Sequence, residues 1–177
     1  MTYKISTPEM EEALARYFNY RQNIIVPNIS WGFHIHECDL LVIRKNGYVL
    51  EVEIKISKAD LIKDREKVHN HEDYYGRIKE LWFAIPEYLQ ENIKYIPEQA
   101  GIIIVYKHEW SDKFFCKTLR EAKSNTCARK LCENEKLAIA RLGTLRIWSL
   151  KRKIINNKKP VKKHIVYDKT QLKLQYE

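Results

Sequence analysis

The sequence of 177 residues is poor in glycine and proline, with only five of each. This scarcity excludes collagen-like and low-complexity chains, and a hydrophobic fraction of 45% excludes an intrinsically disordered chain. Long apolar runs are also lacking, since stretches such as residues 102–106 fall far short of the roughly 20 residues that a membrane-spanning helix requires. The polar N-terminus has no apolar signal region. We therefore expect a folded cytoplasmic protein of about one domain's length.

Cysteine is sparse as well. The four cysteines, at positions 38, 116, 127 and 132, form no C-x-x-C pair and have no partner histidine at zinc-finger spacing. This pattern predicts reduced structural thiols rather than a disulfide framework or a zinc site.

The formal net charge is +9, and most of it lies at the C-terminal end. Residues 151–177 hold nine Lys and Arg against two acidic residues, whereas residues 1–150 are nearly neutral. We therefore predict a domain over 1–150 and a basic tail over 151–177. An extended tail of this length, roughly 90 Å, could follow a nucleic-acid backbone, where counterion release gives affinity without sequence preference. A solvated extension that keeps the protein soluble is the alternative.

Runs that are apolar on both faces indicate strands inside a sheet covered by helices, so the sequence predicts an α/β fold. The predicted strands lie over residues 33–35, 39–43, 48–56, 81–85, 101–106 and 114–119. Thr7, followed by proline and several acids, predicts a helix that runs to about Tyr20. Ser57 predicts the start of a short helix, and residues 126–142 predict one or two helices that end at Gly143.

The segment ECDLLVIRKNGYVLEVEIK carries the candidate chemistry. Alternation along its second strand places Glu51, Glu53 and Lys55 on one face. A two-residue loop between the strands would put Asp39 on the opposite face. A three-residue loop ending at a left-handed Gly47 would instead pair Asp39 with Glu53, with their Cβ atoms about 5 Å apart.

Two carboxylates at that distance repel each other unless a cation lies between them. Mg²⁺ prefers oxygen ligands, commonly uses one or two carboxylates and takes further oxygens from a substrate phosphate. Asp39 and Glu53 could therefore share Mg²⁺ or Mn²⁺, and the ammonium of Lys55 could hold the attacking water or hydroxide. The alternative is an exposed strand whose alternating charges form cross-strand ion pairs.

Asp39, a hairpin and then Glu53-Ile54-Lys55 form a pattern that resembles the PD-(D/E)xK nuclease superfamily, with Cys38 where the family name has proline. The order and spacing of EVEIKISKADLIKDREK, ELWFAIPE and AGIIIVY are similar to the MmcB-like DNA-repair proteins of that superfamily. The resemblance implies a restriction-endonuclease-like α/β fold, with a mixed central sheet flanked by helices. It also implies a metal-dependent nuclease that hydrolyses DNA phosphodiester bonds in repair or processing.

The resemblance assigns roles to individual residues. It implies that Asp39 and Glu53 are metal ligands and that Lys55 is the catalytic lysine. Many members use a further acid on the first helix, for which Glu11 is the candidate because it borders the apolar stripe of that helix. Glu51 could be a second-metal ligand or the partner of a basic residue. The predicted DNA contacts are Lys58, Lys151, Arg152, Lys153, Lys158, Lys159, Lys162 and Lys163.

Two other functions fit the same residues. One is a non-catalytic DNA-binding or repair-scaffold protein that has kept the nuclease fold. The other is an interaction module whose acids form surface ion pairs. The substrate stays open between duplex, branched, single-stranded or damaged DNA and RNA, and cutting of both strands would favour a two-fold homodimer.

Overall fold

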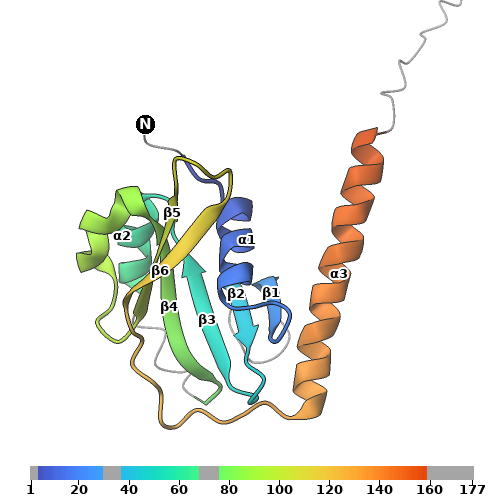
Figure 1. Ribbon diagram of the computed structural model, residues 1–177. Helices are drawn as coiled ribbons and strands as arrows, with labels where there is room; N and C mark the ends of the chain where they lie inside the picture. The colour runs from blue at the N-terminus through green and yellow to red at the C-terminus, as the bar shows by residue number, and fades with distance from the viewer. Residues whose placement is uncertain (1–3, 30–36, 68–75, 159–177) are drawn as a thin grey trace, which may run out of the picture. The chain divides into compact units, whose positions relative to one another are not determined.

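The computed structural model describes residues 4–29, 37–67 and 76–158, and it has an α/β fold (Figure 1). Six strands form a sheet in the order of the chain, from β1 at one edge to β6 at the other. Helices lie against this sheet, as predicted for a mixed central sheet flanked by helices. The elements are α1 (Thr7–Tyr17), β1 (Ile24–Ile29), β2 (Cys38–Ile43), β3 (Val49–Ile54), α2 (Lys58–Lys67), β4 (Ile78–Pro86), the 3₁₀ helix η2 (Glu87–Tyr95), β5 (Gly101–Lys107), β6 (Phe114–Arg120) and α3 (Glu133–Lys158).

β3 is the strand at which the sheet changes from antiparallel to parallel pairing. It pairs with β2 in antiparallel fashion and with β4 in parallel fashion. β4 and β5 are also parallel, whereas the two edge pairs, β1 with β2 and β5 with β6, are antiparallel. Parallel neighbours need a crossover connection, and α2 lies in the crossover between β3 and β4.

The turn between β2 and β3 has the three-residue form. The N–H of Arg44 donates to the carbonyl of Tyr48, and the N–H of Gly47 donates to the carbonyl of Arg44, both over 2.8 Å. Gly47 has a φ of 89°, which glycine adopts without the steric penalty of a Cβ atom. The resulting register pairs Leu41 with Glu51. The predicted three-residue loop is thus confirmed, and the two-residue alternative is wrong.

Three groups of buried apolar side chains hold the layers together. The first joins α1 to one face of β2, β3, β4 and β5, with Met10, Ala13 and Leu14 as the buried residues of the helix. The second joins the N-terminal half of α3 to β1, β2 and β3, through Ile139 of the helix. The third joins α2 and η2 to β4 and β5, through Leu61 and Leu89. Both faces of the central strands are therefore covered.

The N-terminal region differs from the sequence prediction in three ways. α1 ends at Tyr17 and not near Tyr20. Ser6, and not Thr7, caps α1, because both its N–H and its Oγ donate to Glu9 Oε2, over 2.8 and 2.6 Å. β1 is absent from the prediction because Pro27 has no N–H for a strand ladder, although an edge strand tolerates this loss. The strand predicted over residues 33–35 lies outside the described residues.

α3 runs through Gly143, where the sequence predicts a helix end. A Cβ atom at Gly143 would lie 3.4 Å from Val26 Cγ2, so the glycine allows close approach between the helix and β1. Residues 126–132 are not helical, contrary to the prediction.

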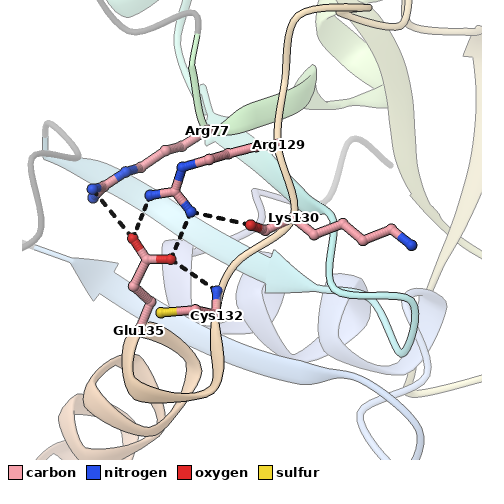
Figure 2. Close-up of polar contacts among 5 residues, drawn as sticks. All are labelled: Arg77, Arg129, Lys130, Cys132 and Glu135. Carbon is pink, nitrogen blue, oxygen red and sulfur yellow. Dashed lines mark hydrogen bonds and ion pairs between the residues drawn. The ribbon is translucent and has the colours of Figure 1, made fainter.

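Glu135 anchors the start of α3 to the start of β4 (Figure 2). Its carboxylate accepts two hydrogen bonds from Arg129, over 2.6 and 2.8 Å, and one from the N–H of Cys132 over 2.9 Å. Arg77, directly before β4, pairs with the same carboxylate over 3.2 Å. Arg129 also donates to the carbonyl of Lys130 over 3.1 Å. The hydrogen bonds from Arg129, and to a lesser extent those from Cys132, outweigh desolvation and lower the pKa of Glu135 to about 2.

The chain divides into two compact units after Thr144. α3 continues without a break across residue 151, where the sequence predicts the start of the basic tail. Residues 145–158 include five Lys and Arg and no acid. The same stretch exposes six large apolar side chains, namely Leu145, Ile147, Trp148, Leu150, Ile154 and Ile155. Among the described helices, including this one, none has the length and apolar character needed to span a membrane.

Candidate functional site

The two glutamates of β3 are buried. Glu51 is 2% exposed and Glu53 is 8% exposed. Their neighbours across the sheet are Leu41 on β2, and Leu81 and Phe83 on β4. Burial of an ionised carboxylate costs free energy unless it is paired or binds a cation. The alternative of an exposed strand with surface ion pairs is therefore wrong for this strand.

Asp39 lies where β2 and β3 stop pairing. The last paired positions are Leu40 and Val52, and the same register one step further places Asp39 opposite Glu53. Asp39 Oδ2 accepts a hydrogen bond from the backbone N–H of Ile54 over 2.8 Å. Because the N–H groups of a strand point along the sheet toward its neighbour, this bond holds the carboxylate in the gap between the two strands.

Lys55 pairs with Glu53 directly after β3. Its Nζ lies 2.6 Å from Glu53 Oε2, and the two side chains are 12% and 10% exposed. Burial raises the pKa of Glu53 to about 7, Lys55 opposes this shift, and the charges of Asp39 and Glu51 add to it. The Glu53 carboxyl is therefore only partly ionised near neutral pH, and any additional positive charge nearby would favour its ionised form.

Glu11 of α1 belongs to the same group of acids. Asn28 donates from Nδ2 to Glu11 Oε1 over 2.9 Å, and the register of β1 with β2 places Asn28 opposite Asp39. Burial raises the pKa of Glu11, the Asn28 hydrogen bond lowers it, and the charge of Asp39 raises it further. Glu12 instead pairs with Arg16 over 2.6 Å. The fold thus brings Glu11, and not its neighbour, close to Asp39.

The chemistry of a divalent-cation site can be tested on two of these acids, Asp39 and Glu53. Within residues 4–29, 37–67 and 76–158, no set of three or more His, Cys, Asp or Glu side chains is arranged to hold a metal ion. Asp39 and Glu53 offer two carboxylates, and Mg²⁺ is commonly bound by one or two carboxylates together with waters and substrate phosphate oxygens. The two residues therefore fit Mg²⁺ or Mn²⁺.

The cysteines contribute no reactive group to this region. All four are free, and Cys38, beside Asp39, is buried. Burial raises the pKa of the Cys38 thiol strongly, and the charges of Glu51, Glu53 and Asp39 raise it further. The thiol therefore stays protonated, and a protonated thiol is neither a good nucleophile nor a metal ligand.

The predicted DNA-contacting residues lie in separate parts of the chain. Lys58 is the exposed first residue of α2, close to Glu53 along the chain. Lys151, Arg152 and Lys153 are exposed on α3. Lys158 is the last residue of α3, and Lys159, Lys162 and Lys163 lie outside the described residues.

Asn28 is the residue of this region that sequence reasoning missed. Pro27 and Asn28 are both residue types that are common in turns, which hides the strand that contains them. Asn28 has a φ of 53°, a left-handed conformation that asparagine tolerates better than most residues. The one sequence signal for this geometry is therefore the residue type itself.

Comparison with known proteins places the fold but not the function. No family model and no curated protein matches the chain. A solved structure, that of the SPO1766 protein of unknown function from Silicibacter pomeroyi, is similar with a TM-score of 0.57 and 13% sequence identity. The match covers 90% of this chain and 98% of that one. At this identity the likeness concerns the fold alone.

Proposed function

We propose that this protein is a Mg²⁺- or Mn²⁺-dependent nuclease that hydrolyses DNA phosphodiester bonds, similar to the MmcB-like proteins of the PD-(D/E)xK superfamily. One observation carries the proposal. The Asp39 carboxylate lies in the gap where β2 and β3 part, opposite Glu53, whose carboxylate lies 2.6 Å from the ammonium of Lys55. Two carboxylates and one ammonium are thus placed at the same end of the β2–β3 pair.

The burial of these groups supports a functional role. Apolar side chains at these positions would make a buried strand more stable, because ionised groups lose hydration when they are buried. Here burial raises the pKa of Glu53 to about 7 even though Lys55 lies within hydrogen-bond distance. Shifts of this kind, with a specific charge partner, are concentrated at functional sites.

Each residue has a distinct part in the proposed reaction. Asp39 and Glu53 hold the cation through their carboxylate oxygens. A bound divalent cation polarises a phosphoryl oxygen and lowers the pKa of a bound water. Lys55 donates a hydrogen bond to the attacking water or hydroxide and offsets the charge that grows on the phosphate. The ion pair with Glu53 keeps the Lys55 ammonium directed at this point.

DNA is the proposed partner because of the distribution of basic residues. Lys58 begins the helix that follows the candidate site, and residues 145–158 combine five basic residues with no acid. Such residues neutralise backbone phosphates and release counterions, which gives affinity that falls steeply with salt. The same residues would serve a non-catalytic DNA-binding protein, so catalysis needs its own test.

Cleavage by two variants tests the proposal. Asp39→Ala and Lys55→Ala should abolish Mg²⁺- or Mn²⁺-dependent cleavage of labelled duplex, branched and single-stranded DNA, while circular dichroism shows a retained fold. Glu98→Ala and Lys63→Ala remove a carboxylate and an ammonium from exposed positions and serve as controls. Both controls should cleave like the unmodified protein.

The outcomes separate the candidate functions. Cleavage that survives both Asp39→Ala and Lys55→Ala refutes the assigned site. A protein that binds DNA with a steep salt dependence, yet neither binds Mn²⁺ nor cuts any substrate, is the non-catalytic DNA-binding protein. A protein that binds neither DNA nor Mn²⁺ would refute both the nuclease and the non-catalytic DNA-binding protein.

A further inference from the structure

Four aromatic rings gather where β5 turns into β6. Tyr106 on β5 and Phe115 on β6 are paired positions, and their ring centroids lie 6.1 Å apart. The imidazole of His108 lies 5.1 Å from each of these two rings. His108 also stacks on Trp110, with centroids 4.8 Å apart and an interplanar angle of 14°. We call these four side chains the ring cluster.

The outer member of the ring cluster is open to solvent. Trp110 is 79% exposed, more than any other large apolar side chain among the described residues. Tyr106, His108 and Phe115 are half-buried beneath it. Because so little of Trp110 is covered, the indole face away from His108 is accessible to a further flat ring. The cluster thus ends in a stacking surface that the fold itself leaves open.

A positive charge lies beside the ring cluster. The Nζ of Lys117, on β6, lies 5.2 Å from the centroid of the Tyr106 ring. Lys117 also pairs with Glu87 over 3.3 Å, and the two side chains are 47% and 56% exposed. An exposed ion pair of this kind contributes little stability, so a phosphate can compete for the ammonium. Aromatic rings and an adjacent cation are the two components of surfaces that bind single-stranded nucleic acid.

The ring cluster lies on the same face of the sheet as the candidate site, at the same end. β3, β4 and β5 are parallel, so their C-terminal ends lie together. The register places Glu53 beside Phe83, and Phe83 beside Ile102. Tyr106 shares the face of Ile102, because side chains alternate along a strand. Two strand spacings and four residues separate Tyr106 from Glu53, which amounts to roughly 16 Å.

We propose that the ring cluster is a stacking platform for unpaired bases of the DNA substrate. This inference rests on the proposed function and names its substrate class. Every base has a π-face, so stacking on aromatic side chains needs no particular sequence. Bases inside a duplex are stacked on their neighbours and cannot reach the indole. The substrate is therefore DNA with a single-stranded segment within a few nucleotides of the cleaved phosphate.

DNA binding without cleavage tests the platform. Fluorescence anisotropy in EDTA measures the Kd of a labelled oligonucleotide, as a single strand and as a duplex of the same sequence. Trp110→Ala should raise the Kd for the single strand by about 5-fold or more and leave that for the duplex nearly unchanged. Trp110→Phe keeps a stacking ring and should retain most of the affinity for the single strand.

Salt dependence and a control variant separate stacking from other effects. Trp110→Ala removes no charge, so the slope of log Kd against log salt should stay as in the unmodified protein, whereas Lys117→Ala should make this slope smaller. Tyr20→Ala removes an aromatic ring that is 55% exposed after the end of α1, and it should bind both DNAs normally. Thermal unfolding should be nearly the same for Trp110→Ala and the unmodified protein, because Trp110 is mostly exposed.

Each contrary result has a distinct meaning. A Trp110→Ala variant that binds the single strand as tightly as the unmodified protein refutes the platform and leaves the proposed nuclease standing; a cluster that serves a protein partner, or only packs the hairpin, gives this result. An equal loss for single strand and duplex also refutes it, since the contact is then with the backbone. If Trp110→Ala weakens only single-strand binding and the unmodified protein cleaves no DNA with Mg²⁺ or Mn²⁺, the platform belongs to a non-catalytic DNA-binding protein and the proposed nuclease is refuted.

Discussion

Replacing Glu53 with glutamine should stabilise the protein at alkaline pH and leave its stability near pH 4 almost unchanged. The reason lies in the burial of this carboxyl, which raises its pKa from the ordinary 4.5 to about 7. Above that pH the folded protein must keep an ionised group in a poorly hydrated position. Glutamine has nearly the same shape and never carries the charge.

The magnitude follows from the shift. Each pKa unit corresponds to about 1.4 kcal/mol, so a rise from 4.5 to about 7 amounts to roughly 3 kcal/mol at a pH above both values. Below pH 4.5 the carboxyl is protonated in both the folded and the unfolded protein, and the effect disappears. Between the two values the folded protein binds more protons than the unfolded one, so this group makes stability fall as the pH rises.

Urea unfolding between about pH 4 and pH 8.5 measures this directly. The free energy of unfolding of Glu53→Gln minus that of the unmodified protein should grow from near zero to roughly 3 kcal/mol across the range. Glu98→Gln, at an exposed position, is the control and should show no such growth. A difference that stays flat, or that shrinks as the pH rises, would refute the reasoning. The stabilised Glu53→Gln variant should also have lost Mn²⁺ binding.

Two further predictions concern the turn and the start of α3. Gly47→Ala should lower the free energy of unfolding by about 1 kcal/mol because residue 47 has a positive φ. Gly76→Ala is the control and should be nearly neutral, because a Cβ atom at position 76 would have no neighbouring atom within 4 Å. Chemical denaturation compares the two variants, and equal effects would contradict the argument. Glu135→Gln should lower the free energy of unfolding by about 1–3 kcal/mol near neutral pH, because the glutamine binds Arg129 more weakly than the carboxylate does. In urea unfolding the difference between the variant and the unmodified protein should shrink as the pH falls from 4.5 toward 2, since protonation of Glu135 weakens the same bonds. Glu133→Gln, at an exposed position in the same turn of α3, is the control for this change, and a loss as large as that of Glu135→Gln would contradict it.

The parts of the fold that sequence reasoning predicted are those with strong local signals. The hairpin of β2 and β3 was predictable because a Gly47 turn and two alternating strands agree with each other. The strands β4 and β5 were predictable from continuous apolar runs. Pro27 hid β1, because a proline argues against a strand unless the strand lies at an edge. The sequence predicts a helix end at Gly143 because glycine is common there, whereas in the structure the glycine allows the helix to pack against β1, a tertiary contact that local sequence does not show.

The candidate site was predictable only in part. The three-residue turn predicts that positions 39, 51, 53 and 55 lie on the same face of the sheet, and the observed register of β2 with β3 agrees with this. The depth of burial of Glu51 and Glu53 does not follow, because it depends on which helices and strands cover β3. The link from Asn28 to Glu11 depends on how α1 lies against β1, which no local pattern encodes.

The bond between Asp39 and the N–H of Ile54 joins residues only 15 positions apart. The pairing of β3 with β4, by contrast, waits for α2 and the chain that follows it. Closing a short loop costs less entropy than closing a long one, so the hairpin can gather its acids before the parallel half of the sheet forms. The approach of these carboxylates is therefore set by a local pairing of the chain, whereas their burial also depends on the later strand β4.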